Sequence, residues 1–440
     1  MSQYLDFYDT SYKPKSSDVI CLFRVEPAYG MSKKEVEPAY GMSKKEVIGR
    51  VASESSNGTW SSLTTLKPHI RKIRAKAYEV KGNYVKIAYP IELFEMGSVP
   101  QLLSSFAGNI FGMKAVKNLR LEDIHFPDKL IKSFRGPEYG IEGIRRRFKV
   151  YKRPLTASVP KPKVGLTTAE FAKVAEDVWS GGVDFLKDDE NLTDQLFNRF
   201  ENRANHCFKI RDKVEKETGE RKGYFCNVTA ETMEMLARAK LVHDLGGEYV
   251  MIDVLTAGFA GFQTLREFCH DHKMAIHCHR AFHSSFTRNP KHGMSMLAVA
   301  KLVRLTGGDS LHVGTVIGKL VGKKDEVLSI EHEIEHNIAN DFLGLPVLDQ
   351  KWGDIKPMFA TSSGGLHPGL VPHIMNLLGN DIIIQLGGGI HGHPGGSYRG
   401  AIALRQSIEA TMHGIPLKEF AQTSPELKQA MEKWGHIRPK

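Results

Sequence analysis

Residues 181–191, GGVDFLKDDEN, place a hydrophobic run directly before a lysine and a group of acidic residues. Side chains two apart along a β-strand share one face, so Phe185, Lys187 and Asp189 line one side of the predicted strand. That face is apolar first and charged afterwards, and Glu190 follows where the strand stops. The segment therefore predicts a buried strand with functional residues at its carboxyl end.

The two carboxylates at this strand end, Asp189 and Glu190, form a suitable site for a hard cation such as Mg²⁺. Lys187 repels a cation as an ammonium, but a neutral lysine amine adds CO2 and becomes a carbamate, which is an anionic oxygen ligand. The alternative is a lysine that pairs with neighbouring acids, a common arrangement at strand ends. The residues alone leave both interpretations open.

Outward from this segment, the chain after residue 153 alternates between strand-like and helix-like stretches. The strand candidates are 155–163, 182–191, 223–230, 249–255, 274–279, 311–315, 358–365 and 382–389, and helical patterns such as 168–181, 230–246 and 293–308 separate them. Eight β-α units over about 260 residues predict a TIM barrel, here assigned to 151–415, with its active site at the carboxyl ends of the strands. Residues 416–440 are expected to form a short helical tail.

The segment before the barrel, 1–150, mixes strands and helices in an α+β order and is predicted to form a separate, ferredoxin-like domain. Strand candidates are 20–25, 65–80, 83–94 and 114–127, and helix candidates are 44–55 and 99–110. An identical tandem repeat, VEPAYGMSKKE, occupies 25–35 and 36–46. The neighbouring strand and helix each need one copy, so the extra copy is expected to add surface loop or helix N-terminal length.

The composition is that of a globular protein, with 440 residues of which 41% are hydrophobic and 25% charged. The sequence has no apolar run of ~20 residues for a membrane span, and its N-terminus does not resemble a secretory signal. Five scattered cysteines without a CxxC pair favour a reducing, cytoplasmic location. The net charge of +10 comes from dispersed basic residues, so neither nucleic acid nor a membrane is an expected partner.

Nearly every strand candidate ends in polar residues or glycines. In barrel order these are Lys161 and Lys163; Lys187, Asp189 and Glu190; Asn227 and Thr229; His279 and Arg280; His312, with Lys319 in the glycine-flanked loop that follows; Ser363, Gly364 and Gly365; and Gln385, Gly387 and Gly388. A tight turn explains any one glycine and a core position explains any one histidine. Their coincidence at one end of one barrel predicts a catalytic site.

The residue types at the strand ends indicate the substrate class. The glycine turns after the seventh and eighth strands present backbone N–H groups to a phosphate. Arg280 and His312 come from another part of the rim and suit a second phosphate. A divalent cation between two phosphate sites predicts a sugar bisphosphate as substrate. Lys161 is suited to the role of acid or base, and Lys319 to that of a lid residue.

Two zinc-like patterns are poor candidates for metal sites. Residues 332–336, HEIEH, fit the HExxH motif, but they belong to the helix expected outside the barrel after the sixth strand, and no glutamate follows until Glu409. Alternation along the fifth strand puts Cys278 on the face opposite His277 and His279, which argues against one compact zinc site there.

These segments resemble the large subunit of ribulose-1,5-bisphosphate carboxylase/oxygenase (RuBisCO), most closely its archaeal form III, over nearly the whole chain. GGVDFLKDDEN is similar to the activation segment, which implies a carbamate on Lys187 that binds Mg²⁺ with Asp189 and Glu190. KPKVGL, IHCHRAFH and LHVGTVIGKLVG resemble the segments that carry catalytic Lys161, His279 and Lys319 and substrate-binding Lys163, Arg280 and His312. TSSGGLHPG and IIIQLGGG resemble the phosphate-binding turns, with Ser363, Gly364, Gly365, Gln385, Gly387 and Gly388.

The resemblance extends to the N-terminal segment, where ESSNGTW supplies Glu54, Thr59 and Trp60, and GNIFGMK supplies Asn109. In this family such residues complete the substrate site of the neighbouring subunit, which implies a homodimer with shared active sites. Assembly of dimers into a ring stays open, and no small subunit is expected. Val159 and Asn57 stand where plant-type members usually have threonine.

The reaction that the resemblance implies is the carboxylation of ribulose 1,5-bisphosphate with CO2 to two 3-phosphoglycerates, through an enediolate stabilised by Mg²⁺ and with O2 as a competing substrate. The Lys187 carbamate is expected to act as base, His279 to assist proton transfers and Lys161 to protonate the last carbanion. The form III resemblance implies a place in the salvage of ribose from nucleotides such as AMP. The alternatives are a RuBisCO-like enolase or isomerase that acts on a related sugar phosphate, and a non-catalytic barrel scaffold.

Overall fold

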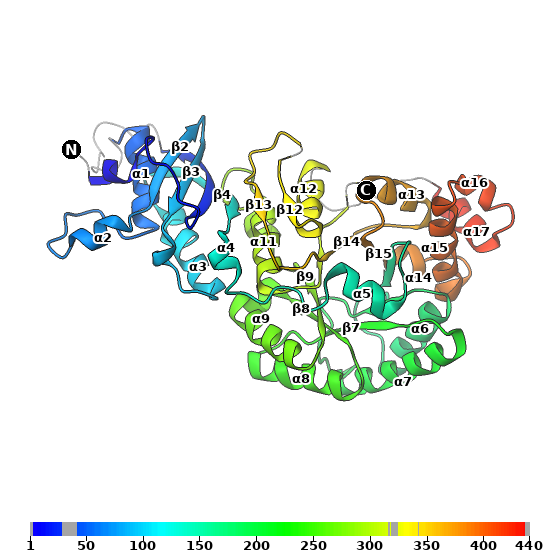
Figure 1. Ribbon diagram of the computed structural model, residues 1–440. Helices are drawn as coiled ribbons and strands as arrows, with labels where there is room; N and C mark the ends of the chain where they lie inside the picture. The colour runs from blue at the N-terminus through cyan, green and yellow to red at the C-terminus, as the bar shows by residue number, and fades with distance from the viewer. Residues whose placement is uncertain (1–2, 29–41, 316, 318–323, 342, 436–440) are drawn as a thin grey trace. The chain divides into compact units, whose positions relative to one another are not determined.

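The computed structural model describes residues 3–28, 42–315, 317, 324–341 and 343–435. The chain divides into two compact units (Figure 1). The first comprises Met1–Arg135, His283–Leu305 and His336–Ile355, and the second comprises Gly136–Phe282, Thr306–Glu335 and Lys356–Lys440. Two segments that follow barrel strands in the sequence therefore group with the first unit. In the described part of the chain, no helix has the length and apolar character that a membrane span requires.

The first unit is built on a sheet with the strand order β10-β4-β1-β3-β2. Its strands are β1 (Val19–Pro27), β2 (Lys76–Lys81), β3 (Tyr84–Tyr89), β4 (Val116–His125) and β10 (Gly293–Met294). Helices α1 (Lys44–Glu54) and α3 (Val99–Phe106) follow β1 and β3 along the chain. The order βαββαβ, with β4-β1-β3-β2 paired antiparallel, is the ferredoxin-like arrangement that the sequence predicted.

The strand predicted for 65–80 is wrong over its first half. Residues Pro68–Lys72 form the short helix α2, and only Lys76–Lys81 form a strand. Pro68 stands in the first helical turn, where a missing N–H costs no hydrogen bond and the fixed φ of proline suits the helix. The preference of Pro68 for the first turn of a helix therefore outweighs the β-like alternation of this segment.

The tandem repeat falls mostly on residues 29–41, which lie outside the described residues. Each described end of the repeat belongs to one element: residues 25–27 are the last residues of β1, and Ser43 caps α1. The Ser43 hydroxyl accepts from the Glu46 N–H, and the Glu46 carboxylate accepts from the Ser43 N–H, which is a capping box. The extra length predicted for the second copy therefore belongs to the undescribed segment.

The second unit holds a closed barrel of parallel strands, as predicted. In chain order the strands are β5 (Leu155–Ser158), β6 (Phe185–Lys187), β7 (Gly223–Asn227), β8 (Tyr249–Asp253), β9 (Ala275–His279), β11 (Ser310–His312), β14 (Phe359–Ser363) and β15 (Ile382–Leu386). The longer helices that follow them along the chain are α6 (Thr168–Ser180), α7 (Phe200–Thr218), α8 (Thr232–Asp244), α9 (Val254–Asp271), α11 (Met296–Thr306), α12 (Lys324–Glu335), α13 (Val371–Leu378) and α15 (Gly396–Met412). Every predicted barrel strand is confirmed.

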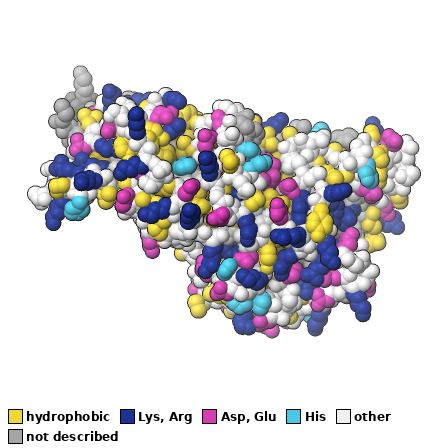
Figure 2. Space-filling view, viewed as in Figure 1, with side chains coloured by type: hydrophobic (Ala, Val, Ile, Leu, Met, Phe, Trp, Pro, Cys, Tyr) yellow, Lys and Arg dark blue, Asp and Glu magenta, His cyan; other side chains and the backbone are white. Residues whose placement is uncertain are grey.

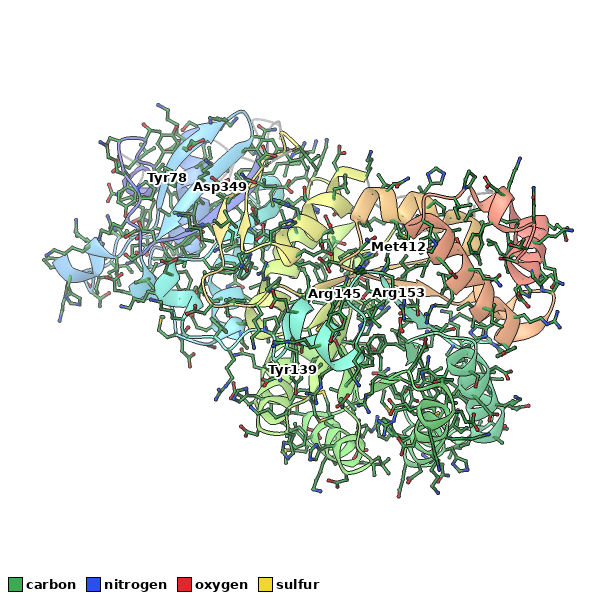
Figure 3. The ribbon with its side chains drawn as sticks, turned by 45° about the vertical axis from the view of Figure 1, so that its right-hand side comes forward. Tyr78, Tyr139, Arg145, Arg153, Asp349 and Met412 are labelled. Atoms are coloured by element: carbon green, nitrogen blue, oxygen red, sulfur yellow. The ribbon has the colours of Figure 1, made fainter. Side chains whose placement is uncertain are left out.

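Aromatic side chains fill the barrel at the amino-terminal end of its strands. Phe185 stacks on Phe225 with ring centroids 4.4 Å apart, and Phe148 of helix α5 (Gly140–Phe148) contacts Phe185 at 4.4 Å. At the same end, Arg153 donates two hydrogen bonds of 2.7 Å to the buried Asp184 carboxylate (Arg153 is labelled in Figure 3). Because α5 closes this end, the opposite end of the barrel is the one that can hold a ligand.

Two helices follow the barrel, α16 (Leu417–Phe420) and α17 (Pro425–Trp434), and they pack on α15 through an apolar cluster that includes Ala410 and Leu427. The shorter elements are η1 (Gln3–Phe7), η3 (Ile91–Leu93), η4 (Asn109–Gly112), α4 (Asp128–Ile131), α10 (Ser284–Thr287), β12 (Ile338–Ala339), β13 (Gln350–Lys351), η5 (Pro368–Leu370) and α14 (Gly388–His391). On the face shown in Figure 2, Lys and Arg side chains are scattered among Asp and Glu, in line with the dispersed charge of the sequence.

Candidate active site

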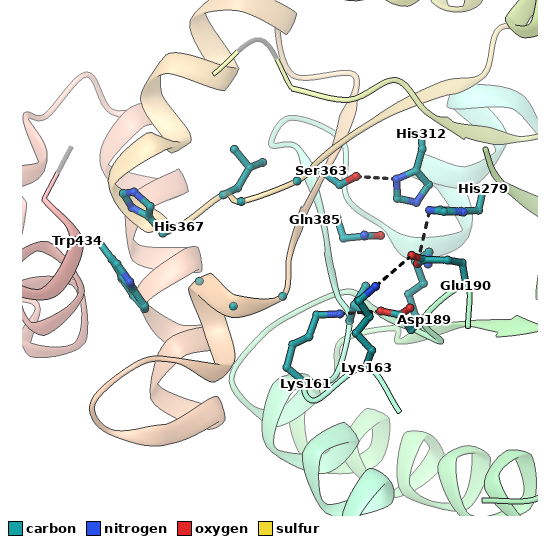
Figure 4. A pocket seen from close by; sticks show the side chains of 18 of the residues that line it. Lys161, Lys163, Asp189, Glu190, His279, His312, Ser363, His367, Gln385 and Trp434 are labelled. Carbon is teal, nitrogen blue, oxygen red and sulfur yellow. Dashed lines mark hydrogen bonds and ion pairs between the residues drawn. The ribbon is translucent and has the colours of Figure 1, made fainter. Parts of the chain in front are cut away.

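A pocket of about 630 Å³ lies at the carboxyl end of the barrel strands (Figure 4). Its wall brings together most of the residues that the sequence predicted: Lys161, Lys163, Lys187, Asp189, Glu190, His279, His312, Ser363, Gly364, Gly365, Gln385, Gly387 and Gly388. They come from the ends of six strands and the loops that follow. A pocket of this volume accommodates a small metabolite.

Lys187 stands at the end of β6 with its side chain almost completely buried. Burial lowers the pKa of its amine below the ordinary lysine value, although the charges of Glu190, Asp253 and Asp189 oppose the shift. Its Nζ donates to the backbone oxygen of Asp188 at 2.8 Å, and among the described residues it forms no ion pair with a carboxylate. Burial thus makes the neutral amine, the form that reacts with CO2, easier to reach than in an exposed lysine, and the described residues show no ion pair of the kind that the sequence left open.

Asp189 and Glu190 face cations across the pocket (Figure 4). Lys161 Nζ lies 2.7 Å from Asp189 Oδ2, Lys163 Nζ lies 3.8 Å from Glu190 Oε1, and His279 Nε2 lies 3.8 Å from Glu190 Oε2. Burial raises the pKa of the Asp189 carboxyl, but the hydrogen bond and charge of Lys161 outweigh burial, so its pKa falls below the usual value. Asp189 is therefore ionised and available to a metal cation that displaces the lysine.

The donor set fits a hard cation only with an additional ligand. Within the described part of the chain, no three His, Cys, Asp or Glu side chains are grouped so that they could hold a metal ion. Asp189 and Glu190 supply carboxylate oxygens, and a carbamate on Lys187 would supply a third anionic oxygen beside them. With that addition the three side chains match the oxygen ligands that Mg²⁺ prefers.

The residue between the two predicted ligands, Asp188, points away from the pocket and anchors the strand end. Its carboxylate accepts hydrogen bonds from the Tyr224 hydroxyl at 2.6 Å, from Arg203 Nη2 at 3.1 Å and from the Asn227 N–H at 3.0 Å. The Asn227 side chain also donates to the Leu192 carbonyl at 3.3 Å. These bonds hold the loop after β6, so Asn227 acts behind the carboxylates rather than in the pocket wall.

The turns after β14 and β15 form the opposite wall of the pocket. Gly364 and Gly365 have φ of 119° and 76°, a region that side chains with a Cβ avoid. A Cβ at Gly389 would lie 2.2 Å from the Leu366 carbonyl oxygen, so the two turns can approach each other only because that residue is glycine. Turns of this kind can present backbone N–H groups to a phosphate, and the phosphate site expected at them stays a prediction.

The two pocket histidines are held by different partners. The Nδ1 of His279 accepts from the Ala281 N–H at 3.1 Å and lies 3.2 Å from Asp253 Oδ1. The Nδ1 of His312 contacts Ser363 Oγ at 2.7 Å, and its Nε2 contacts His277 Nε2 at 2.9 Å. Since both ring nitrogens of His312 are engaged, a phosphate that binds this ring must compete with Ser363 or His277.

Several predicted site residues are not part of this pocket wall. Arg280 is half-buried beside Gly314, where an added Cβ would lie 2.6 Å from its Nη2, and desolvation lowers its pKa to about 10 while the charge of Glu326 opposes this shift. Lys319 lies outside the described residues. The remaining residues belong to the first unit: Glu54 ends α1, Thr59 and the exposed Trp60 follow it, and Asn109 begins η4.

The HEIEH segment is not a zinc motif in this fold. Helix α12 ends at Glu335, so His336 lies beyond the helix that would have to present both histidines on one face.

Three residues near the site, Asp253, Lys433 and Trp434, escaped the sequence analysis, and a fourth, His277, was placed beside His279 on its strand but given no role. Asp253 is the last residue of β8, and its place at a barrel strand end was a signal that could have found it. His277 reaches the site only through His312. Lys433 and Trp434 line the pocket from α17, and Trp434 stacks on His367 at 5.7 Å. No local pattern in the tail indicated its contact with the pocket, because that contact is purely tertiary.

Comparison with known proteins gives matches over nearly the whole chain. The model of the family described as ribulose bisphosphate carboxylase large chain, catalytic domain, matches residues 140–434. The model of the N-terminal domain of the same large chain matches two segments, 6–36 and 33–130, which overlap inside the tandem repeat.

Archaeal proteins are among the similar relatives. A protein of Pyrococcus abyssi named ribulose bisphosphate carboxylase is 47% identical over 441 residues, which cover 99% of this chain and 98% of the relative. A Methanosarcina barkeri protein of the same name is 47% identical and covers 98% and 99%. The structure of a dimeric archaeal Rubisco from Hyperthermus butylicus has a TM-score of 0.92 and 48% identity, covering 99% of this chain and 100% of that chain. An octameric Rubisco from Pyrococcus horikoshii, in complex with sulfate, has a TM-score of 0.90 and 45% identity, covering 99% and 98%.

Proposed function

Since the chain belongs to the ribulose bisphosphate carboxylase large-chain family, we propose that it adds CO2 and water to ribulose 1,5-bisphosphate and cleaves the product into two 3-phosphoglycerates. O2 competes with CO2 for the same substrate carbon. One observation carries the proposal: the buried amine of Lys187 lies beside Asp189 and Glu190 in a pocket whose opposite wall consists of two glycine turns. A RuBisCO-like isomerase and an inactive scaffold give weaker explanations for so complete a set of charged residues.

Lys187 is proposed to become a carbamate before catalysis, since burial favours its neutral amine. The carbamate, Asp189 and Glu190 would hold Mg²⁺, which supplies stabilisation of the negative charge that develops on the substrate oxygens. In addition, the carbamate is placed to act as the base that removes a proton from the third carbon of the sugar. A carbamate that serves both as a metal ligand and as a base would explain why Lys187 lies between the buried core and two carboxylates.

The other charged residues are proposed to move protons and to bind the substrate. Lys161, held 2.7 Å from Asp189, is placed as the acid that protonates the carbanion left after carbon–carbon cleavage. The Nε2 of His279 lines the pocket 3.8 Å from Glu190, and it is proposed to exchange protons with substrate oxygens there.

The two ends of the sugar are proposed to bind on different walls. The turns at Gly364–Gly365 and Gly387–Gly388, with Lys163, suit one phosphate. Ser363, Gln385, His312 and Arg280 are assigned to the rest of the substrate, and Lys319 to closure over it. The last assignment stays a prediction, because Lys319 lies outside the described residues.

The proposed active unit is a homodimer in which Glu54, Thr59, Trp60 and Asn109 complete the site of the partner subunit. The side chain of Trp60 is 76% exposed in the single chain, which leaves it available to a partner. The relatives include a dimer and an octamer, so a ring of dimers is compatible with the same pairing. No small subunit is included. A role in nucleotide-derived ribose salvage is proposed from the form III resemblance alone.

The test is incubation of the purified protein with ribulose 1,5-bisphosphate, Mg²⁺ and labelled bicarbonate. The proposal expects label in 3-phosphoglycerate. Consumption of the sugar without incorporation of label would instead support the isomerase.

A further inference from the structure

His277 is a buried histidine that reaches the pocket only through other side chains. It lies in β9 with 0% of its surface exposed. Its Nδ1 contacts Ser310 Oγ at 2.8 Å, and its Nε2 contacts His312 Nε2 at 2.9 Å. The Nδ1 of His312 in turn contacts Ser363 Oγ at 2.7 Å. Ser310, His277, His312 and Ser363 thus form one chain of hydrogen bonds, here called the histidine chain, from the barrel interior to the pocket wall.

The barrel itself builds this arrangement. Strands β9 and β11 are parallel neighbours in a register that pairs Ser310 with His277. His312 follows Ser310 by two residues and therefore faces the same side of the sheet. The ring of Phe225 stacks on that of His277 at 4.1 Å with an interplanar angle of 2°. The His277 ring cannot turn without loss of both hydrogen bonds and of this stack.

The contact between the two Nε2 atoms restricts the protons on both rings. A neutral imidazole carries one N–H and one acceptor nitrogen. A separation of 2.9 Å between two ring nitrogens requires that one donates and the other accepts. Burial is the largest cause that lowers the pKa of both rings well below the ordinary histidine value, so both are neutral at pH 7. One ring must then be the Nε2–H tautomer and the other the Nδ1–H tautomer.

We propose that His277 is a positioning residue for the pocket: it fixes the tautomer and orientation of His312 and, through His312, the direction of the Ser363 hydroxyl toward the substrate. If His312 accepts at Nε2, its Nδ1–H donates to Ser363, whose own proton points into the pocket. If His312 donates at Nε2, Ser363 must donate to Nδ1 and offers the pocket only an acceptor. His277 thereby determines whether the Ser363 hydroxyl donates a hydrogen bond to the substrate or accepts one from it. The expected effect on turnover rests on the proposed function.

The first test observes the protons directly by neutron diffraction from deuterated crystals. The proposal expects a deuteron on only one of the two Nε2 atoms and opposite tautomers in the two rings. The same tautomer in both rings, or a doubly protonated ring at pH 7, would overturn it. This measurement needs no activity, so it stands even if ribulose 1,5-bisphosphate is not the substrate.

The second test uses two variants that each keep one end of the imidazole. His277→Gln places an amide near the Nε2 position and retains a partner for His312, whereas His277→Asn places it near Nδ1 and retains only the Ser310 contact. We expect His277→Asn to lose roughly tenfold in kcat/KM and His277→Gln to stay within about threefold of the original enzyme, as for loss of one buried hydrogen bond.

Thermal unfolding of both variants is the control for packing against Phe225. Equal losses of kcat/KM in the two variants, or no loss in His277→Asn, would contradict the positioning role. If either variant fails to fold, Ser310→Ala removes the far end of the histidine chain without altering a ring. Neutron maps of that variant should then show both tautomer arrangements mixed, and a single unchanged arrangement would count against the proposal. An original enzyme that does not consume the sugar would refute the proposed function alone.

Discussion

Lys187 combines two properties that rarely coincide, complete burial and the proximity of two carboxylates. Burial destabilises the ammonium form and the carboxylates stabilise it. The effect of burial is the larger, so the pKa of the amine is lowered. A neutral amine can react with CO2, and a bound cation would stabilise the negative charge of the carbamate that forms. The residue that begins as an ambiguous lysine in the sequence is thus best explained by its product with CO2.

Replacement of this lysine tests the carbamate at a single position. Lys187→Arg should lose all measurable carboxylation, because a guanidinium cannot form a carbamate, while the protein stays folded. Lys222→Arg is a matched control, since Lys222 is also buried and burial lowers its pKa, but it donates to Glu220 and the Val183 carbonyl. The measurement is the steady-state rate of carboxylation by each of the two variants. Activity retained in Lys187→Arg would remove the carbamate from the mechanism.

The pH dependence of carbamate formation follows from the direction of the pKa shift. The folded pKa of Lys187 lies below the ordinary 10.5, so between the two values the unfolded chain binds more protons than the folded one. The contribution of this group to stability therefore rises with pH through that window and is lost as pH falls. Carbamate formation needs the same neutral amine, so the ¹³C carbamate signal should reach half of its maximum below pH 10.5. A midpoint at 10.5 would indicate an ordinary, exposed lysine.

At the scale of elements, the barrel strands were predictable because each is a short apolar run that ends in polar residues, and β6 shows both features within eleven letters. Helix α2 was missed because one proline outweighs a β-like pattern. The roles of α17 and His277 could not be predicted, because they depend on contacts between segments distant in sequence. Trp434 meets His367 across 67 positions, and His277 meets Ser310 across 33.

At the closed end of the barrel, away from the pocket, a substitution of Asp184 should change the stability of the protein without altering the pocket. Asp184 accepts two hydrogen bonds from Arg153 and two from Thr156, and it is 2% exposed. Burial, the largest single cause, raises the pKa of its carboxyl, but the charge and hydrogen bonds of Arg153 with the charges of Arg405 and Lys222 together lower it. Asp184→Asn should lower the free energy of unfolding by about 3 kcal/mol, because it removes a buried carboxylate and leaves the half-buried Arg153 without its counterion.

Urea unfolding at pH 7 measures this effect, and an exposed pair supplies the control. Asp177→Asn breaks the surface ion pair with Lys173 and should cost at most about 0.5 kcal/mol. The contribution of Asp184 is present above pH 3.8 and is lost as pH falls through its lower folded pKa, so the difference between the original protein and Asp184→Asn should shrink only in strong acid. Equal effects of the two substitutions would show that the buried pair adds no stability.

For the whole molecule, the dimer proposal predicts complementation between inactive chains. Glu54→Gln impairs the residue offered to the partner, and Lys187→Arg impairs the chain's own barrel. In a heterodimer of the two variants, one site would combine an intact Lys187 with an intact Glu54, and the other site would lack both. Co-expression with two affinity tags isolates the heterodimer, which should show about half of the activity of the original dimer. An inactive heterodimer would place Glu54 in the site of its own subunit.

The fate of ¹⁴C-bicarbonate with ribulose 1,5-bisphosphate and Mg²⁺ tests most directly whether the pocket carboxylates this sugar. We expect acid-stable label in 3-phosphoglycerate, two product molecules for each sugar consumed, and label in one of the two. The Lys187→Arg protein, folded and assayed in parallel, should incorporate none. Consumption of the sugar by the original protein without labelled 3-phosphoglycerate, or no consumption by a preparation that forms the carbamate, would contradict the proposal that this pocket carboxylates ribulose 1,5-bisphosphate.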